Sequence, residues 1–262
     1  MERIIGYIAS ILVVLLVIPV HEFAHAYVAV KSGDPTPKLA GRYTINPIKH
    51  FDLVGLLMMI VVHFGWAKPV PVNPYNFKNL RRDYFLVSIA GITVNLIMAF
   101  IFALLLVVFC NISYAGLGLG VYSNVTAKTL YLSFASVATY LNQMGRLTSL
   151  SYVLLLLLYY VLLYGVFINI NLFAFNLIPV FPLDGFRILE CILPQNKPSK
   201  VLEFLRKYGY YVLLALLIWS AVCSYLVDYI PLLKYTDILG IALSFVDNLF
   251  FGLFTGFWGL FF

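Results

Sequence analysis

His21 and His25 are four residues apart in a His-Glu-x-x-His motif, with Glu22 directly after the first histidine. In a helix this spacing puts both imidazoles on one face, where they can bind the same zinc ion. Glu22 then lies next to the metal and can act as a general base. The motif ends a long apolar run, where ionisable side chains are costly and usually functional. We therefore predict a zinc site; the alternative is a polar helix end whose histidines are merely hydrogen-bonded.

Catalytic zinc needs a third protein ligand and one open position for water. Asp184 is the best candidate, because it follows a long apolar segment and the stretch Pro179-Val-Phe-Pro182, whose prolines end a helix. Gly185 then permits a tight turn. The topology predicted below puts Asp184 at the depth of the histidine pair and on the same side of the membrane. A plain turn at the end of a span is the alternative.

Other side chains compete for the role of third ligand. A different class of His-Glu-x-x-His membrane peptidase uses a glutamate on a later helix, and Glu190 and Glu203 are the only later glutamates. Both lie in a basic region and lack a partner motif, so we favour Asp184. The remaining histidines, His50 and His63, have no helical histidine partner and are predicted to be structural.

Two asparagines fall within apolar segments. Asn95 ends the stretch Gly91-Ile-Thr-Val-Asn, and Asn176 lies just before the prolines that precede Asp184. An amide in hydrocarbon needs a hydrogen-bond partner. Bonding between helices is one explanation. The other is that these amides contact the substrate backbone or the oxyanion of the reaction.

The composition indicates an all-α polytopic membrane protein with about five to six transmembrane helices. The chain has 262 residues, of which 63% are hydrophobic and 11% charged, whereas soluble domains carry about 25% charged residues. A span needs about 20 mostly apolar residues. The segments of this kind are approximately 4–30, 84–110, 150–177, 208–231 and 237–262. Residues 53–64 are short for a span, and residues 121–145 favour an interfacial helix over a span.

Residues 65–76 contain three prolines within six positions, which excludes a helix interior. Alternation and proline suit an edge strand or hairpin. With residues 53–64 before it, this segment could form a short re-entrant β element that dips into the membrane, where it would need protein cover or a wet cavity. An ordinary surface loop is the equal alternative.

The basic residues predict the orientation. If residues 53–64 do not cross, thirteen of the seventeen Lys and Arg residues fall in 31–83 and 187–207, on one side of the membrane. The other side has only Arg3, Lys128, Arg146 and Lys234. The positive-inside rule makes the first side cytoplasmic. The net charge of +6 is explained in this way, without a nucleic-acid partner.

The combined motifs resemble the site-2 protease family of intramembrane metalloproteases. They are His21-Glu-x-x-His25, Gly91-x-x-x-Asn95 and Asn176-x-x-Pro-x-x-Pro-Leu-Asp-Gly185. The likeness covers residues 4 to about 190 and is greatest to small prokaryotic members without a PDZ or CBS domain. It departs from the family at Ile92, where many members have proline. It implies that His21, His25 and Asp184 bind one zinc ion, that Glu22 is the catalytic acid and base, and that Asn95 and Asn176 lie close to the site.

The predicted function is hydrolysis of peptide bonds in or near transmembrane segments of membrane proteins. Zinc would lower the pKa of a bound water to about 7, and Glu22 would accept its proton. A non-enzymatic zinc-binding membrane protein or transporter is the alternative. We expect one multi-pass domain over residues 1–262, in the cell membrane of a prokaryote, with its site toward the cytoplasm. Residues 208–262 would serve packing, gating or contact with a partner, and whether an accessory regulator exists stays open.

Overall fold

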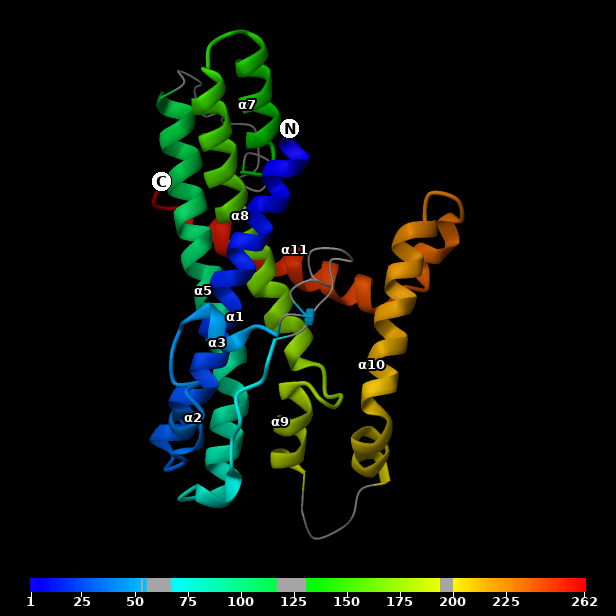
Figure 1. Cartoon of the computed structure of the whole chain (residues 1–262). Coiled ribbons are helices and arrows are strands. Elements are labelled where there is room, and N and C mark those ends of the chain that lie inside the picture. Colours follow the sequence, from blue (N-terminus) through cyan, green and yellow to red (C-terminus); the bar gives the residue numbers. More distant parts are fainter. Residues whose placement is uncertain (53, 56–66, 117–130, 194–199) are drawn as a thin grey trace. The chain divides into compact units, whose positions relative to one another are not determined.

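The computed structural model describes residues 1–52, 54–55, 67–116, 131–193 and 200–262 (Figure 1). Within these ranges the chain is helical, and no strand is present. The elements are α1 (Glu2–Lys31), α2 (Thr36–Leu39), α3 (Pro47–His50), η1 (Pro74–Asn76), α5 (Leu80–Gly116), α7 (Phe134–Gln143), α8 (Ser149–Leu177), α9 (Asp184–Ile192), α10 (Lys200–Leu226), η2 (Pro231–Tyr235) and α11 (Ile238–Trp258).

Among the described residues, five helices are long and apolar enough to cross a membrane: α1, α5, α8, α10 and α11. The predicted all-α membrane fold is therefore confirmed. The fourth predicted segment, 208–231, is shifted in the structure, since α10 already begins at Lys200 and ends at Leu226. The helix begins before the apolar run because its first turns contain leucine, glutamate, lysine and arginine. These residues favour a helix whether or not they are apolar.

Two compact units are formed from interleaved parts of the chain. One comprises residues 1–17, 96–170 and 248–262, and the other comprises residues 18–95 and 171–247. In the first unit, Phe134 of α7 packs its ring against Phe109, Tyr114 and Tyr159, with ring centroids 5.1–5.5 Å apart. All the predicted site residues belong to the second unit.

Asp34 organises the chain that follows α1 in the second unit. Its carboxylate accepts hydrogen bonds from Thr36, from the Asn76 side chain at 2.8 Å and from the Asn73 backbone N–H at 2.7 Å. Burial by itself would raise the pKa of Asp34, but these hydrogen bonds outweigh it and hold the pKa below its ordinary value. The carboxylate thereby ties the end of α1 to the segment that leads into η1.

The described part of the proline-rich segment is extended. Phe51 and Ala67 form one antiparallel bridge, and the Lys68 N–H donates to the His50 carbonyl at 2.8 Å. The chain then runs without helix or strand until η1 begins at Pro74. The β element predicted for residues 65–76 is thus limited, in residues 67–76, to this bridge.

Two uncertain segments are only partly covered. Residues 53 and 56–64 lie outside the described residues, so the prediction for 53–64 stays a prediction. Of residues 121–145, the part from 131 onward is described, and it contains α7, a helix of 10 residues. Residues 121–130 lie outside the described residues, so the prediction of an interfacial helix over 121–145 stays a prediction.

Polar contacts join the C-terminal helices to each other and to α8. Trp219 of α10 donates to the Thr236 carbonyl at 3.1 Å, and Ser220 donates to the Asp237 carboxylate at 3.0 Å. Asn171 of α8 donates to the Asp247 carboxylate of α11 at 2.9 Å. Within the second unit, these contacts join residues 208–247 to one another and to α8.

Candidate metal centre

The two histidines lie on one face of α1, as their spacing predicts. His21 and His25 are 8% and 6% exposed. Their rings meet edge to face with centroids 4.7 Å apart, and their Nε2 atoms are 3.1 Å apart. Two imidazole nitrogens therefore converge on one buried position.

One face of α5 receives this histidine pair. Val87, Gly91 and Asn95 follow one another at intervals of four residues, so they line a single face. The His25 Nδ1–H donates to the Val87 carbonyl at 2.7 Å, and the Asn95 amide lies 3.0 Å from His21 Nδ1. Between them Gly91 has no side chain, and a Cβ there would lie 2.4 Å from His25 Nε2. This contact explains why glycine stands four residues before Asn95.

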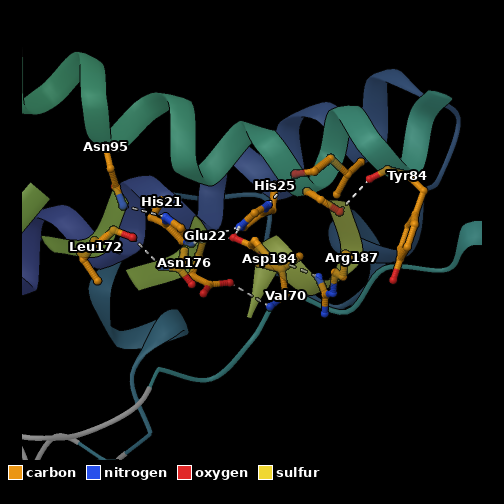
Figure 2. Close-up of polar contacts among 12 residues, drawn as sticks. His21, Glu22, His25, Val70, Tyr84, Asn95, Leu172, Asn176, Asp184 and Arg187 are labelled. Carbon is orange, nitrogen blue, oxygen red and sulfur yellow. Dashed lines mark hydrogen bonds and ion pairs between the residues drawn. The ribbon is translucent and has the colours of Figure 1, made fainter. Parts of the chain in front are cut away.

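Asp184 completes the group from α9 (Figure 2). Its Oδ2 lies 3.0 Å from His25 Nε2 and 3.5 Å from His21 Nε2, and the residue is 7% exposed. The ligand atoms of the three residues lie within 4.8 Å of one another. Ligands at 2.0–2.2 Å from a tetrahedral zinc ion would be about 3.3–3.6 Å apart. Two imidazoles and a carboxylate at this spacing fit zinc.

The charge state of Asp184 suits a metal ligand. Burial by itself would raise the pKa of the carboxyl, but the neighbouring His25 and His21 outweigh this and hold the pKa below its ordinary value. Arg187, one turn later in α9, adds a longer contact of 3.9 Å to Oδ1. Among the described residues the Oδ2 atom accepts no well-aligned hydrogen bond and faces the Nε2 atoms of His25 and His21. A buried carboxylate oxygen of this kind is open to a cation.

Helix α9 is held at both ends by other parts of the second unit. Gly185 packs on the end of α8, since a Cβ there would lie 2.3 Å from the Leu177 carbonyl oxygen. At the other end, Arg81 of α5 donates to the carbonyls of Cys191 and Ile192. The cation satisfies carbonyls of the last turn and complements the helix dipole.

The prediction of a tight turn at Gly185 is wrong. Asp184 and Gly185 are the first two residues of α9, and glycine is needed there for close contact with α8.

Glu190, the rival third ligand, is paired with Arg206 of α10 and is not part of the histidine group. His50 is fully buried and contacts the Thr44 carbonyl at 2.6 Å through Nε2, while His63 lies outside the described residues.

Glu22 follows the first histidine and contacts the proline-rich segment. Its Oε2 accepts a hydrogen bond from the Val70 N–H at 3.0 Å. Val70 stands between Pro69 and Pro71, so the segment offers few backbone donors and this one is used to hold the carboxylate. Figure 2 shows Glu22 beside the three metal-ligating candidates.

Of the two predicted asparagines, Asn95 contacts the histidine pair. Asn95 is fully buried and contacts His21. Asn176 donates to the Leu172 carbonyl of its own helix at 3.0 Å (Figure 2). Val87 and Val70 act through their main-chain groups, and Arg81 binds main-chain carbonyls, so none of the three belongs to a motif that could be recognised in the sequence.

The sequence matches a known family over most of its length. Residues 9–220 fit the family model of "Peptidase family M50". The chain belongs to peptidase family M50, the site-2 protease family. The resemblance read from the three motifs is thereby confirmed. M50 membership agrees with the five apolar helices and with the group of two histidines and one aspartate.

A relative in Bacillus subtilis (strain 168) is named "Putative zinc metalloprotease YwhC". It is 37% identical over 223 residues, which cover 83% of this chain and 86% of the relative. No significant match was found among solved structures. Family and relative together indicate a site-2-type zinc metalloprotease, and zinc as its metal.

Proposed function

We propose that this M50 chain is an intramembrane endopeptidase that hydrolyses peptide bonds in or near the transmembrane segments of membrane proteins. One observation carries the proposal: the His21, His25 and Asp184 donors converge in a buried position, and the histidines belong to a helix long and apolar enough to span a membrane. A peptidase with such a site would meet its substrates within the bilayer. The alternative of a transporter has no supporting observation in the described residues.

His21, His25 and Asp184 would hold the zinc ion, each through one donor atom. When bound, zinc acidifies a water molecule and polarises the carbonyl that is attacked. Val87 contacts Nδ1 of His25, and Asn95 contacts Nδ1 of His21. Ligating histidines are usually oriented by a partner of the ring nitrogen that does not bind the metal, so these two residues would orient the imidazoles toward zinc.

Glu22 would move the proton. Its carboxylate is one residue from a proposed ligand and is oriented by the Val70 N–H. In the first step it accepts a proton from the attacking water, and in the second it passes that proton to the leaving amine. Asn176 keeps its proposed role near the substrate or oxyanion; among the described residues its side chain donates to the Leu172 carbonyl of its own helix.

The extended segment from Ala67 to Asn73 would receive the substrate. A transmembrane helix hides its backbone carbonyls, so the scissile region must unwind before hydrolysis. An unwound peptide can pair its backbone with an extended chain at the edge of a site. The segment passes Glu22 at Val70, which supports its placement beside the scissile bond. The distribution of basic residues supports a site that opens to the cytoplasm.

The Glu22→Gln variant tests this function. Purified enzyme in proteoliposomes would be mixed with a reporter carrying one transmembrane segment, and the cleavage site read by mass spectrometry. We expect a rate at least about 100-fold lower, with zinc content unchanged. Glu203→Gln, in the first turn of α10, is the matched control. Cleavage by Glu22→Gln at the wild-type rate would refute the proposal, and zinc flux without cleavage by wild type would favour a transporter.

A further inference from the structure

The contact between His21 and Asn95 poses a problem of hydrogen-bond chemistry. The Asn95 Nδ2 atom lies 3.0 Å from His21 Nδ1, in a residue that is fully buried. Its Oδ1 atom is also buried and has no partner among the described residues. The amide thus turns its donor toward His21 and leaves its acceptor unused. A buried acceptor without a partner destabilises the folded protein.

The proposed ligand set fixes where the imidazole protons must be. A neutral imidazole carries one N–H, and its other nitrogen has the lone pair. The Nε2 atoms of both histidines face Asp184 Oδ2 at 3.0 and 3.5 Å, so Nε2 would bind the metal and Nδ1 would carry the proton. His25 meets this requirement, because its Nδ1 contacts the Val87 carbonyl, which can only accept.

His21 needs an acceptor in the same position. Its Nδ1–H would otherwise meet the Asn95 amino group, and both are donors. A half-turn of the amide about its Cβ–Cγ bond exchanges Oδ1 and Nδ2 without further movement. The unpartnered oxygen then accepts from the Nδ1–H of His21, so that both histidines donate to carbonyls presented by α5.

We propose that, in the zinc-loaded enzyme, Asn95 is a positioning residue whose Oδ1 accepts the Nδ1–H of His21 and fixes the metal-binding tautomer. The inference rests on the proposed ligand set and assigns Asn95 a role different from substrate or oxyanion contact. An oxyanion partner must donate a hydrogen bond to the substrate. The full burial of Asn95 and its contact with His21 favour the role of an acceptor behind the ligand.

Two variants separate the acceptor from the donor role. Asn95→Asp keeps an oxygen toward His21 but removes every amide donor, and Asn95→Leu removes both groups at similar size. Asn169→Leu is the matched control, because Asn169 is also fully buried in an apolar helix and donates to the Gly165 carbonyl instead. The readouts are the zinc dissociation constant from chelator competition and the visible spectrum of the cobalt-substituted protein.

We expect Asn95→Leu to weaken zinc binding about 10–100-fold, the usual effect of removing a partner of a ligating histidine. Asn95→Asp should bind zinc within a few-fold of wild type and keep the cobalt spectrum, and Asn169→Leu should not change either. Weakening by Asn95→Asp as large as that by Asn95→Leu would overturn the inference. So would an Asn95→Leu variant that binds zinc normally. His21→Ala tests the ligand set separately: if it bound zinc as wild type does, the proposed function itself would fail.

Discussion

Gly91 of α5 lies so close to His25 of α1 that a side chain at this position would collide with the ligating face of the imidazole. The missing Cβ would stand 2.4 Å from His25 Nε2 and 2.5 Å from His21 Cε1. The absence of a side chain at Gly91 is therefore what lets α5 approach the histidine pair.

Gly91→Ala should displace the imidazoles and weaken zinc binding. Forcing an extra methyl group into a packed site costs about 1–3 kcal/mol, which corresponds to a loss of affinity of at least about 5-fold. Chelator competition on the purified protein measures this loss. Gly252→Ala in α11 is the control, because a Cβ there meets no atom of the described residues within 4 Å. Equal zinc affinity of the two variants would contradict this account of Gly91.

Arg81→Ala should loosen α9 and, through it, Asp184. Arg81 donates from α5 to the Cys191 and Ile192 carbonyls, and Asp184 begins the same helix. Hydrogen bonds from a charged group contribute about 1.5–3 kcal/mol, so we expect zinc affinity to fall about 10-fold. Arg81→Lys should recover part of it. The exposed Arg146 provides the control Arg146→Ala, and a normal affinity of Arg81→Ala would show that α9 is positioned without Arg81.

Asp34 should give the protein an acid-sensitive component of stability. Its folded pKa is lowered, so its contribution is fully present above the ordinary pKa of about 3.9 and is lost as the pH falls through the folded pKa. Asp34→Asn should reduce stability near pH 7 by at least about 2 kcal/mol, roughly the value of one hydrogen bond to a charged group. Thermal unfolding in detergent from pH 7 down to pH 3 measures the difference.

The difference in melting temperature between wild type and Asp34→Asn should shrink as the pH falls below about 4. A difference that stays constant over this range would contradict the assignment, since it would mean that the carboxylate charge contributes nothing.

The five spans and the histidine pair could be predicted because their signals are local. Apolar runs of sufficient length and a spacing of four residues are visible in the sequence alone. The position of Asp184 beside His25 is harder to predict, because it depends on the packing of α8, α9 and α5. The charge pattern predicted that Asp184 lies at the depth of the histidine pair. The assignment of Asp184 as a ligand depended largely on the family resemblance.

Other features could not be predicted because their cause is tertiary. Helix α9 is only 9 residues long and follows two prolines, so its beginning at Asp184 was not recognised. The need for Gly185 lies in the carbonyl of Leu177, and the need for Gly91 lies in two imidazoles from another helix. Val70 contributes a backbone N–H that any residue except proline would supply.

The central claim is that His21, His25 and Asp184 hold one zinc ion. X-ray absorption at the zinc edge, with metal content of the purified wild type, Asp184→Ala and Glu190→Ala, tests it most directly. We predict one zinc ion per wild-type chain with nitrogen and oxygen ligands at about 2.0–2.2 Å, its loss in Asp184→Ala and its retention in Glu190→Ala. Wild-type zinc content and an unchanged spectrum in Asp184→Ala, or loss of zinc in Glu190→Ala, would contradict the account.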